Sequence, residues 1–234
     1  MKTFIRYLAM GCLLGLGLFT LPANAQLMKC SDVSTGDTHP DGLNVSDVTF
    51  GLSTLTGNAA NDCYGVYSTQ GGAPSHILNA FNTAWPDSWE FLVKDDSDGD
   101  ELMGNFAGIK FTLSTTNVPS STSGNWTLQW EATAAGALPS SFDIGVAIKA
   151  SNQAANYFFD DLVFPISPTS SNGSWEVTYK NNGGQIPAIS GLWIYIRNGS
   201  STPPIPPNPA PEPGILWLLA TGLLGFRFAA KKRS

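Results

Sequence analysis

The stretch Trp126-Thr-Leu-Gln-Trp-Glu131 has an apolar side chain at every second position and a polar side chain between. Successive side chains of an extended chain point to opposite faces, so this period of two predicts a β-strand with one buried face. The two tryptophans make that buried face bulky. A strand of this kind needs partner strands and an opposing apolar layer.

Further short runs before and after this stretch also mix or alternate apolar and polar residues, and turns rich in Gly, Ser, Asn and Pro separate them. The expected strands are 45–52, 63–68, 89–94, 109–113, 126–131, 144–149, 156–164, 174–180 and 192–197. Short strands between such turns are typical of antiparallel sheets with one buried face. The predicted fold class is all-β: an antiparallel β-sandwich of jelly-roll type over residues 26–198, followed by a C-terminal membrane-anchor helix.

One helix is expected within this domain, over Ser75 to Trp85. Ile77 and Phe81 fall on the same apolar side of it. Ser75 is the predicted N-cap, and Pro86 is expected to end the helix.

The N-terminus carries an export signal. Lys2 and Arg6 precede an apolar segment over 8–21. Ala23-Asn-Ala25, after this segment, has the small-x-small form of a cleavage site. Residues 1–25 are therefore predicted to be a signal peptide, and the mature chain is predicted to begin at Gln26.

The C-terminal part of the chain contains two segments of unusual composition, one rich in proline and one apolar with a basic end. Residues 199–213 form a Pro-rich linker, which is expected to be extended. Residues 214–234 combine an apolar run with the basic end Lys231-Lys-Arg233. The apolar run is short for a bilayer, which needs about 20 apolar residues. We expect a membrane helix whose basic end stays on the cytoplasmic side.

Pro211, Glu212 and Pro213, followed by this helix and basic end, closely resemble the PEP-CTERM sorting signal of Gram-negative bacteria that produce exopolysaccharide. The resemblance implies export through the inner membrane and transient anchoring by the tail. It also implies processing near the motif by an exosortase, a membrane-embedded enzyme similar to cysteine transpeptidases. The expected destination is the cell surface or the extracellular matrix.

The body of the chain resembles a recurrent group of PEP-CTERM proteins whose exported domain has no established activity. The shared stretches include Trp89-Glu-Phe-Leu-Val-Lys-Asp-Asp96 and Tyr157-Phe-Phe-Asp-Asp161. These stretches look like strand and core features, so the resemblance implies no catalytic residue.

The charge of the chain excludes some partners. The whole chain has a formal net charge of −6, but residues 26–210 hold 6 basic and 17 acidic residues, a net of −11. Nucleic acids and anionic lipids attract basic surfaces. We therefore expect no nucleic-acid partner for the exported domain.

Two cysteines remain after signal cleavage, Cys30 and Cys63. An exported protein reaches an oxidising compartment, which favours a disulfide between them. A reactive or metal-binding thiol pair is the alternative.

An acidic loop is the candidate metal site. Asp96, Asp98 and Asp100 alternate around a turn at Gly99, and carboxylate oxygens suit calcium. The spacing does not match an EF-hand loop. The alternative is a solvated acidic turn that binds no metal, and no other cofactor is expected.

Enzymatic activity is not expected. His39 and His76 are the only histidines, which leaves little for a catalytic triad or a histidine-based zinc site. A glycosidase needs only two suitably spaced carboxylates, for which Glu90, Glu131 and Glu176 are the candidates.

Two non-enzymatic functions remain. One is a structural component of the envelope or of an exopolysaccharide matrix. The other is a glycan-binding module with a polysaccharide partner, in which Trp193 or Tyr195 stacks on sugars. A row of exposed tryptophans would favour glycan binding, and buried tryptophans would favour the structural role.

Overall fold

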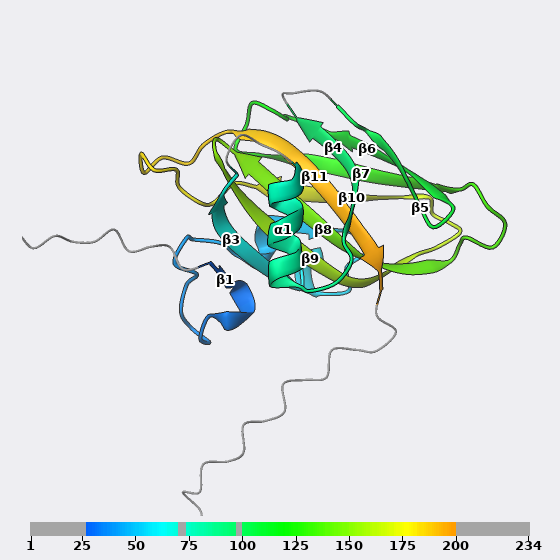
Figure 1. Cartoon of the computed structure of the whole chain (residues 1–234), viewed down its shortest axis with the longest axis horizontal. Coiled ribbons are helices and arrows are strands. Elements are labelled where there is room, and N and C mark those ends of the chain that lie inside the picture. The colour runs from blue at the N-terminus through cyan, green and yellow to red at the C-terminus, as the bar shows by residue number, and fades with distance from the viewer. Residues whose placement is uncertain (1–26, 70–73, 97–99, 200–234) are drawn as a thin grey trace, which may run out of the picture.

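The computed structural model describes residues 27–69, 74–96 and 100–199 and contains two antiparallel sheets. The six-stranded sheet has the order β1-β3-β9-β8-β11-β4, and the five-stranded sheet has the order β2-β10-β7-β6-β5 (Figure 1). The strands of the first sheet are β1 (Met28–Lys29), β3 (Asp62–Ser68), β4 (Glu90–Asp96), β8 (Ser140–Ala150), β9 (Gln153–Phe164) and β11 (Ile189–Asn198). Those of the second are β2 (Val48–Phe50), β5 (Met103–Phe106), β6 (Ile109–Thr115), β7 (Ser123–Ala132) and β10 (Ser170–Glu176). Short 3₁₀ helices cover Cys30–Asp32, Val45–Asp47 and Thr56–Asn58.

The prediction of antiparallel sheets is confirmed, and each of the nine expected runs overlaps a strand. Strand β10 begins earlier than expected, at Ser170 rather than Ser174. Residues 170–174 are polar or glycine, so they give no apolar alternation that would reveal a strand. Val177 and Tyr179 suggested a later strand, and they are buried although they follow it. The jelly-roll connection of the strands stays a prediction.

The space between the two sheets is a large apolar core, in which tryptophans pack over glycines of the neighbouring strand. Trp126 of β7 lies opposite Gly173 of β10, and Trp175 of β10 lies opposite Gly124 of β7. A Cβ on Gly173 would lie 2.2 Å from the Trp126 indole nitrogen, and one on Gly124 would lie 2.6 Å from the Trp175 ring. A backbone carbonyl oxygen lies equally close, that of Thr49 at Gly173 and that of Thr116 at Gly124, so both positions require glycine.

The other face of the six-stranded sheet is covered by helix α1 (Pro74–Ala84), as Figure 1 shows. Phe81 of α1 is fully buried, and a Cβ on Gly145 of β8 would lie 2.4 Å from its ring. The helix is confirmed within a residue of its predicted ends, although Ser75 lies inside it rather than at the N-cap. The expectation of one buried face is wrong for this sheet, because α1 buries the second face.

A disulfide joins the N-terminal segment to the six-stranded sheet. Cys30 is bonded to Cys63 of β3, with 5.0 Å between their Cα atoms. The backbone N–H and the hydroxyl of Ser31 both donate to the Asp62 carboxylate at 2.9 Å. The predicted pairing is confirmed, and it attaches the short strand β1 and the segment after it to β3.

Within the ranges that the structure describes, no helix is long and apolar enough to cross a membrane. The predicted signal peptide (1–25) and the sorting helix with its basic tail (214–234) lie outside these ranges, as does all of the Pro-rich linker except Gly199.

Candidate functional site

Three carboxylates gather where β8 and β9 depart from regular pairing. The register of the two strands shifts between Phe142 and Ile144. At this β-bulge, Asp143 of β8 faces two consecutive residues of β9, Asp160 and Asp161. Asp161 has a left-handed φ of 46°, a conformation that Asp adopts more readily than most residues. One carboxylate oxygen from each aspartate lies within 4.8 Å of the other two.

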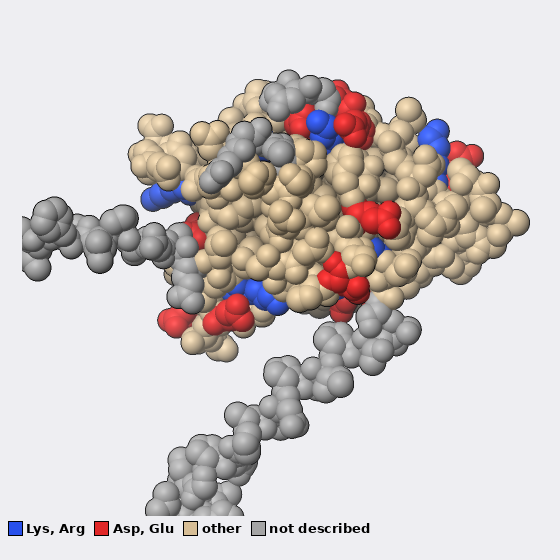
Figure 2. Space-filling view, viewed as in Figure 1, with Lys and Arg blue, Asp and Glu red and all other residues tan. Residues whose placement is uncertain are grey.

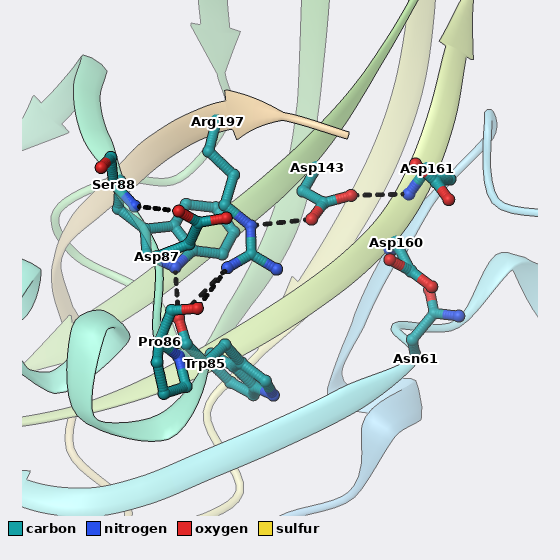
Figure 3. Close-up of polar contacts among 10 residues, drawn as sticks. Asn61, Trp85, Pro86, Asp87, Ser88, Asp143, Asp160, Asp161 and Arg197 are labelled. Carbon is teal, nitrogen blue, oxygen red and sulfur yellow. Dashed lines mark hydrogen bonds and ion pairs between the residues drawn. The ribbon is translucent and has the colours of Figure 1, made fainter. Parts of the chain in front are cut away.

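Arg197, at the end of β11, supplies the positive charge of this site. Its Nε donates to the buried Asp143 carboxylate at 2.7 Å, and its Nη1 donates to the Trp85 carbonyl at 3.2 Å. The guanidinium also lies 4.5 Å from the centre of the Trp89 ring and 5.3 Å from that of Phe158. Figure 3 shows the guanidinium between Asp143 and the segment that follows α1. Arg197 thus joins β11, β8 and the end of the helix.

Each aspartate of the site has a different set of partners. The second oxygen of Asp143 accepts from the backbone N–H of Asp161 at 2.8 Å. The backbone N–H of Asp160 donates to the side-chain oxygen of Asn61 at 3.0 Å. Burial raises the pKa of Asp160 to about 6, with further contributions from the negative charges of Asp143 and Asp161. Burial and Asp143 also raise the pKa of Asp161, and Arg197 lowers it.

The site could offer three oxygen ligands to a hard divalent cation. Both oxygens of Asp143 are already engaged, one by Arg197 and one by the backbone of Asp161. A cation would therefore have to compete with the guanidinium for the buried carboxylate. These contacts indicate that Asp143 and Arg197 form an internal ion pair that stabilises the bulge. Asp160 and Asp161 lie next to this pair, with their carboxylates close to that of Asp143.

Sequence reasoning did not find this site. Asp160 and Asp161 stand out in the sequence only as part of the stretch Tyr157 to Asp161, and Asp143 is separated from them by a turn. The available signal was two consecutive aspartates inside an otherwise apolar run, Tyr157 to Phe164. Such a pair indicates a bulge or a bend, but it does not identify the residue opposite.

The predicted calcium loop is described only in part. Asp98 lies outside the described residues, Asp100 is exposed, and Asp96 is buried in an ion pair of 3.2 Å with Lys94. Asp95 accepts a hydrogen bond from the Thr115 hydroxyl, and burial raises its pKa. Calcium binding by Asp96, Asp98 and Asp100 stays a prediction, and the ion pair with Lys94 would compete with it.

The three candidate glutamates do not come together. Glu131 lies on β7, and Glu176 lies on β10 opposite Ser123, eight residues along β7 from Glu131. At about 3.4 Å per residue, this separation is about 27 Å. Glu90 belongs to the other sheet. A glycosidase needs its two carboxylates within roughly 5–9.5 Å, so the Glu131–Glu176 pair does not meet this requirement.

The aromatic residues expected to stack on sugars are buried. Trp193 and Tyr195 point toward α1 rather than solvent, and their exposed fractions are 1% and 0%. All six tryptophans in the described ranges are buried. The prediction of Trp193 or Tyr195 as a sugar platform is therefore wrong, because the helix covers the face on which they lie.

The comparison with known proteins identifies the C-terminal signal. Residues 209–233 match the PEP-CTERM protein-sorting motif. No curated protein and no solved structure matches the chain. The chain is thus an exported protein that carries an exosortase-targeting signal, and Pro211, Glu212 and Pro213 lie within the matched residues.

Proposed function

We propose that this protein is anchored by its tail in the inner membrane, cut by an exosortase, and left at the cell surface or in the extracellular matrix. There it has a structural or interaction role in the envelope or in an exopolysaccharide layer. The matched sorting motif at 209–233 is the observation that carries the proposal. Membrane attachment uses the segment 214–234, and processing separates it from the folded body.

Features of the body support an extracellular role. The Cys30–Cys63 disulfide suits an oxidising compartment. The described tryptophans lie inside the fold, which favours the structural role over sugar stacking. Figure 2 shows acidic side chains in separate groups on the viewed side of the body, without one continuous charged patch.

The proposal includes no catalytic activity and no required cofactor. His39 is buried, and its ring contacts the Met28 carbonyl and the Asp41 backbone N–H, so it has a structural use. His76 lies exposed on α1. A glycan-binding module remains the alternative function, now without Trp193 or Tyr195 as its contact residues.

Replacement of Glu212 by Ala tests the proposal in a host that has the processing enzyme. Wild type should appear as a shortened form outside the membrane fraction. Glu212→Ala should accumulate as a membrane-bound precursor of higher mass, because the motif needed for processing is lost while the folded body is unchanged. Immunoblots of membrane, periplasmic and extracellular fractions, with intact mass spectrometry, measure both effects.

Asn208→Ala is the matched control, since it lies in the same linker but outside the matched residues. It should be processed like wild type. Equal masses and equal membrane fractions for wild type and Glu212→Ala would contradict the proposal. A wild-type protein that remains full-length in the membrane would also contradict it.

A further inference from the structure

The outer face of the five-stranded sheet has adjacent rows of uncharged hydroxyl and amide side chains. Strand pairing places Asn172, Thr127 and Ser114 side by side in one row. It places Ser170, Gln129 and Thr112 in the next row. We call these six residues the hydroxyl–amide face. Their neighbours along each strand, such as Leu128, point into the core.

The hydroxyl–amide face is open to solvent and has free hydrogen-bonding capacity. Helix α1 packs on the other sheet, and Ser114, Gln129, Ser170 and Asn172 are exposed. Thr127 donates to the side-chain oxygen of Asn172 at 2.8 Å, which orients that amide. Among the described residues, the side chains of Ser114, Gln129 and Ser170 have no hydrogen-bond partner.

The charge of this face differs from that of the domain. Residues 26–210 have a net charge of −11, yet none of the six residues is charged. The adjacent row contains Lys110 and Glu131, which lie directly opposite each other and offset each other's charge. A neutral polymer meets no electrostatic penalty here, whereas the acidic domain repels an anionic one.

The shape of the face also suits an extended chain. Neighbouring strands lie about 4.8 Å apart, so each row presents polar groups at regular intervals. A shallow hollow of about 440 Å³ lies over the second row and the row next to it, and its lining includes Thr112, Gln129 and Ser170 together with the opposed charges of Lys110 and Glu131. A second hollow of about 340 Å³ lies along β7 and β10, where Ser123, Asn125 and Ser174 contribute to its lining.

We propose that the hydroxyl–amide face binds a neutral polysaccharide, an inference that rests on the proposed role in an exopolysaccharide layer. Sugar hydroxyls both donate and accept hydrogen bonds, as do the amides and hydroxyls of the face. None of the six residues is aromatic, so recognition uses hydrogen bonds without ring stacking. Each contact is weak in water, and binding depends on several sugar units engaged together.

Affinity electrophoresis of the full-length mature protein tests this inference. The gels contain the host's own extracellular polysaccharide, separated by anion exchange into a neutral and an anionic fraction. The neutral fraction should retard the wild type. Gln129→Ala/Asn172→Ala should raise the dissociation constant at least tenfold, and Ser114→Ala should have a smaller effect in the same direction.

Asn82→Ala is the matched control, because it removes an exposed amide from α1, which packs on the other sheet. It should bind like wild type, and all variants should keep the disulfide and the wild-type melting temperature. Equal retardation of wild type and the double variant would overturn the inference, as would retardation by the anionic fraction alone or by neither fraction. Failure to bind polysaccharide would not contradict the sorting proposal, because the Glu212→Ala experiment measures processing of the tail separately.

Discussion

Arg197→Met should destabilise the protein strongly, because it leaves the Asp143 carboxylate buried without its counter-ion. The side chains of Asp143 and Arg197 are only 1% and 13% exposed. Breaking a buried pair by removing one partner costs about 3–5 kcal/mol. Loss of the cation from above Trp89 adds about 0.5–1 kcal/mol. The expected loss is about 4 kcal/mol, a large part of the 5–15 kcal/mol typical of a folded domain.

Asp143→Asn is the matched partner variant. It keeps an oxygen that can accept from the Asp161 backbone and leaves Arg197 its contacts with Trp85 and Trp89. Its expected cost is smaller, about 1–3 kcal/mol. Because the two residues form one pair, the double variant should cost less than the sum of the single changes by at least about 1 kcal/mol.

Urea unfolding of the oxidised protein, followed by tryptophan fluorescence and far-UV circular dichroism, measures these costs. Similar m-values show that the variants unfold from comparable states. A cost below about 1 kcal/mol for Arg197→Met would refute the reasoning. So would strictly additive effects in the double variant, because the ion pair would then carry no coupling energy.

Three further predictions concern pH, packing and the disulfide. The pKa of Asp160 is near 3.8 in the unfolded protein and about 6 in the folded protein. Between these pH values the folded state keeps a proton that the unfolded state has lost, so the free energy of unfolding should fall as the pH rises. Asp160→Asn should flatten this part of the pH profile and raise stability above pH 6, as urea melts across pH 3–8 would measure. Gly173→Ala should cost about 1–3 kcal/mol, because the added Cβ displaces Trp126 and the Thr49 carbonyl of the neighbouring strand. The fluorescence of Trp126 should shift, and an unchanged melt would rule out the close approach. Reduction of Cys30–Cys63, which are 33 residues apart, should cost about 3–4 kcal/mol in the chain-entropy model, and native protein with two free thiols by mass spectrometry would contradict the pairing.

Much of the architecture could be predicted from local patterns. Alternation at Trp126, Leu128 and Trp130 identified a strand and its buried side, because side-chain direction in a strand depends only on the parity of the position. The helical spacing of Ile77 and Phe81 predicted the helix near Ser75 to Trp85. The sorting motif was also readable, since its function resides in consecutive residues and needs no fold.

The candidate site could not be predicted in this way. Asp143 meets Asp160 and Asp161 because one extra residue in β9 shifts the register at a bulge, and Arg197 reaches them from another strand. Contacts between residues far apart in the chain depend on strand order and register, which a local pattern does not specify.

The sequence by itself determined which side chains share a face and where the chain is sent. Only the tertiary structure decided what covers each face. Trp193 and Tyr195 are two residues apart in β11 and therefore point to the same face of the sheet, where they could have been exposed. Helix α1 packs over that face and makes them core residues. Gln129 and Asn172 lie on a face without such a cover and remain exposed. The physical reason is that alternation reports the direction of a side chain, whereas burial depends on the layer that packs against it.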